Sequence, residues 1–292
     1  MVIEFIKSII LGIVEGITEW LPVSSTGHLI LVNEFLNLNV SSDAEVNEGF
    51  VNMFNVVIQL GAIMAVVVIF WKKLFPFGKK NNPDPWKKEG VGSYVKADIM
   101  TMWFKVIVAC VPAAVIGFLF DETFERLFYK PWIIAIALIV FGVAFIVIEN
   151  RNKKSSAKVN SMSELTYTAA LIIGGFQLIA AIFPGTSRSG ATILGALMIG
   201  ISRTVAAEFT FFLAVPVMFG ASLLKLLKYD GGFTGEQIGI LAVGMIVAFA
   251  VSMVVIKFLM DYIKKHDFKV FGWYRIVLGI AVLAYFGIKA VV

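Results

Sequence analysis

Long apolar runs constrain the fold of this chain more than any other feature. Runs near the length that crosses about 30 Å of hydrocarbon, roughly 20 residues, occur at 50–71, 100–120, 131–149, 206–228, 237–260 and 273–290. Hydrophobic residues make up 59% of the 292 residues and charged residues 15%. There is too little polar surface to face water on all sides. The sequence therefore predicts an all-α integral membrane protein with six transmembrane helices.

Two further apolar stretches, 5–38 and 166–200, are each interrupted by a proline and a polar cluster. The interruptions read LPVSSTGH at 21–28 and FPGTSRSG at 183–190, and each flanking half is too short to cross a bilayer. Irregular backbone is tolerated at membrane depth only where it lines protein or a water-filled cavity. We therefore expect two re-entrant helix-loop-helix hairpins.

The two hairpins resemble copies of each other. At a shift of 162 residues, the matching pairs are Ile10 with Ile172, Gly12 with Gly174, Pro22 with Pro184 and Ser25 with Ser187. Each hairpin precedes three spans, which makes 1–149 one repeat and 163–292 the other within a single membrane domain, 1–292. An odd number of crossings inverts the second copy. The predicted architecture is a pair of inverted-topology repeats whose hairpins meet near the midplane.

Loop charge predicts the orientation of the chain. The loops 72–99, 150–165 and 261–272 fall on one side and are rich in lysine, whereas the loops on the other side are mainly acidic. The positive-inside rule places the Lys-rich loops, 72–99 among them, in the cytoplasm. The net charge of +5 is carried by short clusters between spans, which favours membrane lipids over nucleic acid as partners.

Two carboxylates lie inside the first hairpin. Glu15 and Glu19 are spaced i to i+4 and so share one face of a helix. An ionised residue at bilayer depth costs about 2.5–3.5 kcal/mol, and two like charges one turn apart repel each other. A cation or a shared proton must compensate. The pair is either structural, held by hydroxyls or an arginine, or it binds a metal or handles protons.

Both polar loops immediately precede an apolar half-helix. Free backbone N–H groups and the positive end of the helix dipole favour an anion there, and Arg188 adds a planar fork suited to phosphate. One such loop is typical of a simple helix cap, but two of them beside two carboxylates indicate a site for a phosphorylated substrate. The loop residues concerned are Ser24, Ser25, Thr26, Gly27 and His28 in the first, and Thr186, Ser187, Arg188, Ser189 and Gly190 in the second.

A phosphate beside carboxylates calls for a bridging hard cation, so we expect Mg²⁺ or Ca²⁺ held through Glu15 or Glu19. His28 can activate Ser25, three residues earlier, or act directly on water. A histidine bonded only to backbone is the structural alternative. Among smaller features, Asn52, Asn55 and Gln59 form a polar stripe that either lines the cavity or joins helices. Arg203 is expected to pair with Glu208.

The segments EGITEWLPVSSTGHL and FPGTSRSGATI strongly resemble the two signature segments of the bacterial undecaprenyl-diphosphate phosphatase family, also known as bacitracin-resistance proteins. IQLGAI at 58–63 and GISRTVAAEFTFFLAVPVM at 200–218 are also family-like. The resemblance implies metal-dependent hydrolysis of a polyprenyl diphosphate, the lipid carrier of peptidoglycan synthesis. It implies a site on the outer face of the bacterial plasma membrane, and bacitracin resistance.

The resemblance also implies roles for single residues. Glu15 and Glu19 resemble the acidic pair linked to metal and catalysis, and Ser25 and His28 the nucleophile and its partner. We therefore expect Glu19, Ser25, His28 and Arg188 to be catalytic. The expected substrate-binding residues are Ser24, Thr26, Gly27, Ser187, Ser189, Gly190, Thr192 and Gln59.

A transporter is the competing hypothesis. Inverted repeats with broken helices are typical of secondary transporters, and such a protein could flip the lipid carrier monophosphate across the membrane. It would need Arg188 and the hydroxyls but not a carboxylate pair beside His28. The sequence leaves the oligomeric state open, a homodimer included.

Overall fold

The computed structural model describes residues 2–78, 84–153 and 155–291, without the side chains of residues 118, 121, 122, 125 and 291. These residues form helices joined by loops. The helices are α1 (Val2–Thr18), α2 (Ser25–Phe35), α3 (Ala44–Ile69), α4 (Trp71–Leu74), the 3₁₀ helix η1 (Gly90–Tyr94), α5 (Ala97–Phe128), α6 (Pro131–Asn152), α7 (Tyr167–Ile182), α8 (Arg188–Met198), α9 (Arg203–Lys228), α10 (Gly235–Ile263) and α11 (Lys269–Val291).

Six helices of the described chain are long and apolar enough to cross a membrane, namely α3, α5, α6, α9, α10 and α11. They coincide with the six predicted spans, so the all-α membrane fold is confirmed. Helix α5 differs in extent, because it continues to Phe128 where the sequence predicted a loop from 121. Residues 121–128 contain neither glycine nor proline, so nothing in the backbone stops the helix before Pro131 opens α6.

The two interrupted stretches form helix-loop-helix pairs, α1 with α2 and α7 with α8. Helices α2 and α8 have 11 residues each, about half of what a span requires. The insertion of these pairs as re-entrant hairpins stays a prediction. Within the predicted Lys-rich loop 72–99 the structure describes the end of α4 and η1, whereas Lys79, Lys80 and also Lys154 lie outside the described residues.

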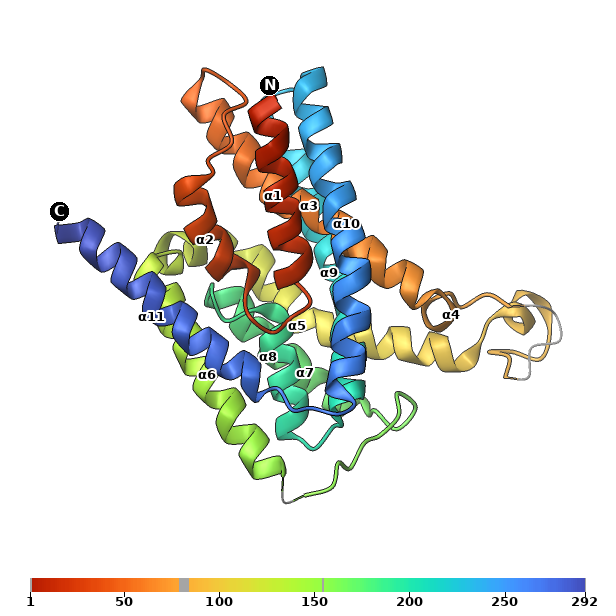
Figure 1. Ribbon diagram of the computed structural model, residues 1–292. Coiled ribbons are helices and arrows are strands. Elements are labelled where there is room, and N and C mark those ends of the chain that lie inside the picture. The colour runs from red at the N-terminus through yellow and green to blue at the C-terminus, as the bar shows by residue number, and fades with distance from the viewer. Residues whose placement is uncertain (1, 79–83, 154, 292) are drawn as a thin grey trace.

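Helix packing links the two halves of the chain. Helix α1 packs along α10, α7 packs along α5, and α6 pairs with α11 (Figure 1). The first helix of each helix-loop-helix pair therefore contacts a spanning helix of the opposite half. Such an exchange of partners supports the predicted inverted repeats, and it brings the tips of both pairs to the interior of the bundle (Figure 1).

Glycines allow these long helices to approach closely. A Cβ atom on Gly174 of α7 would lie 2.4 Å from the carbonyl oxygen of Ala109 in α5. On the other pair, a Cβ on Gly12 of α1 would lie 2.7 Å from the carbonyl oxygen of Gly244 in α10. Small residues let membrane helices gain backbone contact and dispersion energy where the hydrophobic effect contributes little.

The expected pair of Arg203 with Glu208 is wrong. Arg203 Nε instead donates to Glu149 Oε1 at 2.9 Å, and Glu208 accepts from Lys73 at 2.7 Å. Residues five apart on a helix point about 140° away from each other, because each residue turns the helix by about 100°. The two side chains therefore meet different neighbouring helices.

The glycine packing generates a stability test with a matched control. Gly174→Ala should lower the free energy of unfolding by about 1–3 kcal/mol, because the added methyl overlaps backbone that cannot move aside. Gly175→Ala adds the same methyl one residue on, where no atom lies within 4 Å, and should leave stability unchanged or slightly higher. Thermal melting in detergent measures both. Equal melting temperatures would contradict this packing.

Candidate functional site

The short helices α2 and α8 begin in the same way. Ser24 and Ser187 are their N-caps, with φ of 75° and 68°, and their hydroxyl oxygens accept hydrogen bonds from the N–H groups of Gly27 and Gly190 at 3.2 and 3.1 Å. A positive φ is uncommon outside glycine and carries a cost that clusters at functional sites. Both turns are therefore held in one unusual conformation.

This equivalence corrects the predicted alignment of the two loops. The sequence matched Ser25 with Ser187, whereas the structure equates Ser24 with Ser187 because both are N-caps. The inserted residue therefore lies before the cap, not after it. As a result Ser25 and Arg188 occupy the same position, the first residue of each helix.

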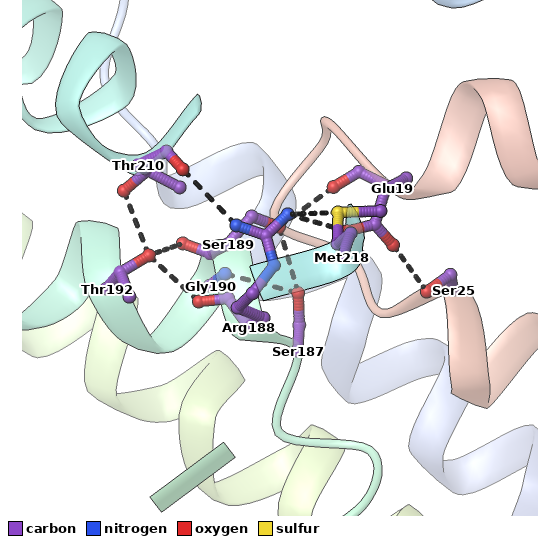
Figure 2. A network of polar contacts seen from close by, with 9 residues as sticks. All are labelled: Glu19, Ser25, Ser187, Arg188, Ser189, Gly190, Thr192, Thr210 and Met218. Carbon is purple, nitrogen blue, oxygen red and sulfur yellow. Dashed lines mark hydrogen bonds and ion pairs between the residues drawn. The ribbon is translucent and has the colours of Figure 1, made fainter. Parts of the chain in front are cut away.

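The carboxylate of Glu19 joins these two positions (Figure 2). Arg188 Nη2 lies 2.8 Å from Glu19 Oε1, and Ser25 Oγ donates to Glu19 Oε2 at 2.9 Å. The two side chains of the ion pair are only 14% and 9% exposed. The expected meeting of the two loops is thus confirmed, with acid, guanidinium and hydroxyl in one network.

Helix α9 supports the guanidinium from behind. Arg188 Nη1 donates to the carbonyl oxygen of Thr210 at 3.2 Å, and Nη2 lies 3.2 Å from the sulfur of Met218. The buried hydroxyl of Thr192 donates to the carbonyl oxygen of Arg188 and accepts from Thr210 Oγ1, each at 2.9 Å. Thr192 was expected to bind substrate, but its hydroxyl is bonded within the protein and fixes the turn that carries Arg188.

The remaining predicted binding residues divide into two groups. Ser189 Oγ donates to the carbonyl oxygen of Glu19 at 3.1 Å and also meets Ser187 Oγ at 3.1 Å, which ties one loop to the other. Thr26 and Gln59 make no side-chain hydrogen bond to any residue that the structure describes. The structure therefore does not bring these two into the network.

Glu15 is fully buried one helical turn from Glu19. Within the described chain, neither of its carboxylate oxygens accepts a hydrogen bond. Gln177, the residue of α7 that the sequence alignment matched with Glu15, is also buried, and both of its amide heavy atoms lack a described partner. Buried polar groups are nearly always paired, so these two side chains are the clearest unsatisfied binding capacity of the helix pairs.

His28 faces away from Ser25. Its Nδ1 lies 2.7 Å from the carbonyl oxygen of Ser24, and its Nε2 lies 2.7 Å from the hydroxyl of Tyr274 in α11. Because a carbonyl can only accept, Nδ1 carries a proton, and Nε2 of the neutral ring accepts from Tyr274. The expected Ser25–His28 hydrogen bond is therefore wrong for this state. Glu19 takes the place of the base beside Ser25.

Arg275 of α11 is a site residue that the sequence analysis missed. It is fully buried, and its guanidinium donates to the carbonyl oxygens of Pro22 at 3.3 Å, Gly185 at 3.0 Å and Thr186 at 2.6 Å. It thus ties both loops to one helix. The available signal was an arginine inside the apolar run 273–290, where a charge is rare and usually functional.

Comparison with known proteins agrees with this arrangement. A family model described as bacitracin resistance protein BacA matches residues 8–281. The chain belongs to the BacA family. The BacA match spans both loops and Arg275, and so covers the whole network around Glu19.

Curated relatives of this BacA chain match it over nearly its full length. It is 60% identical to the undecaprenyl-diphosphatase of Desulfitobacterium hafniense, covering 99% of each chain. It is 59% identical to undecaprenyl-diphosphatase 1 of Clostridium acetobutylicum, covering 97% of this chain and 98% of the relative. It is 60% identical to an undecaprenyl-diphosphatase of Enterococcus faecalis, covering 96% of each.

The buried ion pair makes a prediction about stability that is independent of any activity. Arg188→Met should lower the free energy of unfolding by about 3–5 kcal/mol, because it leaves Glu19 buried without its counter-charge. Adding Glu19→Gln to the same chain should recover part of that loss. Unfolding of the two single variants and the double variant in detergent gives the coupling. Strictly additive effects would show that the pair contributes nothing.

Proposed function

We propose that this BacA-family protein hydrolyses undecaprenyl diphosphate to undecaprenyl phosphate and inorganic phosphate. This reaction recycles the lipid carrier for peptidoglycan synthesis and confers resistance to bacitracin. The names of the curated relatives support the substrate. The observation that carries the proposal is the Glu19 carboxylate held between Arg188 and Ser25 where two helix N-termini meet.

The two helix ends would bind the diphosphate of the substrate. Free N–H groups at the starts of α2 and α8 and the Arg188 guanidinium supply the positive potential that phosphate oxygens need. In the free protein Arg188 is paired with Glu19. A bound diphosphate competes for the guanidinium, and its arrival leaves Glu19 free to act as a base. Arg188 then stabilises the charge that spreads over the transferred phosphoryl group.

Glu19 would accept the proton of the attacking group. In one route Ser25 Oγ attacks the terminal phosphorus, its proton passes to Glu19, and the bond from that phosphorus to the bridging oxygen breaks. Lipid monophosphate leaves, and water then hydrolyses the phosphoserine. In the other route a water activated by Glu19 or His28 attacks directly. The hydrogen bond of 2.9 Å from Ser25 to Glu19 supports the first route.

We further propose that a divalent cation takes part. No group of three or more His, Cys, Asp or Glu side chains converges in the part of the chain that the structure describes, so the protein offers mainly Glu15 and Glu19. This donor set fits Mg²⁺, which is commonly bound through one or two carboxylates together with substrate phosphates. The unsatisfied oxygens of Glu15 support the assignment. When bound, the cation would neutralise phosphate charge.

Access to the site would come from the side opposite the lysine-rich loops, which is the outer side under the positive-inside rule. Two cavities of about 430 and 270 Å³ lie towards that side and share Asn52 and Lys225 as lining residues. The second is also lined by Asn55 and by Pro184 of the second loop. They form a polar route to the loop that carries Arg188. The polar stripe on α3 would thus line the entrance.

The reaction itself is tested with purified protein and a soluble isoprenyl diphosphate such as farnesyl diphosphate. Wild-type protein should release phosphate, and EDTA should stop the release until Mg²⁺ or Ca²⁺ is restored. Arg188→Ala and Glu19→Gln should each lower kcat by at least about 100-fold, because they remove charge stabilisation and the base. Cys110→Ala is the control and should retain full turnover. Wild-type protein that binds the lipid without turnover would instead indicate a carrier.

Ser25→Ala separates the two routes of attack. Loss of activity comparable to that of Glu19→Gln is expected, because the hydroxyl that Glu19 contacts is removed. The measurement is phosphate release at saturating substrate, with a search for a phosphorylated Ser25 by rapid quench and mass spectrometry. Retention of a large fraction of kcat would assign the attack to water.

A further inference from the structure

A second cavity lies at the lysine-rich end of the molecule. It has a volume of about 770 Å³ and lies between α4, the start of α5, the start of α9 and the loop 160–163. We call it the Lys105 cavity, lined by Lys72, Lys96, Lys105, Ser161, Ser163 and Thr204 among others. It shares no lining residue with the network around Glu19. Helix α4 lies on the opposite side of the view from α2 (Figure 1).

Lys105 is the notable residue of this cavity. The residue is only 6% exposed, yet among the described residues its ammonium makes a single long contact, 3.5 Å to the carbonyl oxygen of Ser163. It forms no ion pair with a described carboxylate. A buried ammonium needs a counter-charge or several short hydrogen bonds to offset its desolvation. Lys105 has neither in the described part of the chain.

The acidic residues of the cavity do not supply that counter-charge. Glu208 is bound through both oxygens by Lys73, at 2.7 and 2.9 Å. Asp84 and Asp98 also line the cavity, so that three carboxylates face four lysines and leave an excess of one positive charge. The lysine that lacks a described acidic partner is the buried one, which directs the excess charge to the inner part of the cavity.

An apolar surface adjoins the cavity on α5. Phe104 is 41% exposed and Ile107 is 54% exposed, and they flank Lys105 on the same helix. A ligand whose anionic group met Lys105 could lay an acyl or isoprenyl chain along this surface. The hydroxyl groups of Ser161 and Thr204 provide donors for further phosphate oxygens.

We propose that the Lys105 cavity binds the phosphate group of a phosphomonoester lipid from the adjacent leaflet. The Lys105 ammonium is its counter-charge, Lys72 and Lys96 attract it at the mouth, and its chain lies over the α5 surface. Free phosphate has the same recognition chemistry without the chain, and the experiment separates the two. This site is independent of the hydrolysis proposed above, since none of its residues belongs to that machinery.

The test measures binding in the full-length Arg188→Ala protein, purified in detergent and freed of native lipid, so that the Glu19 network contributes little. Farnesyl phosphate, farnesol and inorganic phosphate are titrated while the melting temperature and the native mass spectrum are recorded. Farnesyl phosphate should bind and raise the melting temperature, and farnesol should not. Lys105→Met should weaken binding at least tenfold, Lys105→Arg should restore most of it, and Lys265→Met is the control on the same side of the chain.

Each result decides the proposal in one direction. Inorganic phosphate that binds as tightly as farnesyl phosphate, with the same dependence on Lys105, supports the phosphate site but overturns the lipid as its ligand. Unchanged affinity in folded Lys105→Met protein overturns the site. Should that variant not fold, the surface pair Lys72→Met and Lys96→Met is expected to weaken binding about threefold, and no change there has the same adverse meaning. Phosphate release by otherwise wild-type Lys105→Met protein should be unaltered.

Discussion

The ion pair of Glu19 with Arg188 is the contact on which the rest of the site depends. It joins residues that are 169 positions apart in the chain and belong to two separate helix-loop-helix pairs. A carboxylate or a guanidinium buried alone would cost several kcal/mol. Because the two groups compensate each other, neither loop can be held in its buried position without the other. The three hydrogen bonds of Arg275 to loop carbonyls reinforce the same junction.

The charged groups of this protein follow two different rules. Glu149 is fully buried, but Arg203 and the backbone N–H of Phe268 bind its oxygens, so it fixes helices to one another. Glu15 is equally buried and has no described donor. A satisfied carboxylate contributes to the fold, whereas an unsatisfied one next to a helix N-terminus is available to a ligand. The position of Glu15 in the second group is what distinguishes a reactive site from a structural lock.

Much of this arrangement follows from the sequence, because membranes simplify the prediction. Helix length and hydropathy fix the six spans, and a charge at bilayer depth must find its opposite, which is why Glu19 and Arg188 could be brought together on paper. The partners of His28 and Arg275 could not be predicted in this way. They are a tyrosine hydroxyl and three backbone carbonyls, and which carbonyl faces which helix is decided only by packing. The shifted alignment of Ser24 with Ser187 escaped for a similar reason, since a backbone angle leaves no mark in hydropathy.

The left-handed caps at Ser24 and Ser187 limit how these loops can vary over evolutionary time. A threonine keeps the hydroxyl, but its branched Cβ is strongly disfavoured at positive φ. Glycine accepts the backbone angle but gives up the side-chain bond to the helix. Asparagine or aspartate alone could satisfy both conditions, and aspartate would set a negative charge where an anion is to bind. The commonest conservative exchange for serine is therefore closed at both positions, and natural drift there is confined to a very small set of residues.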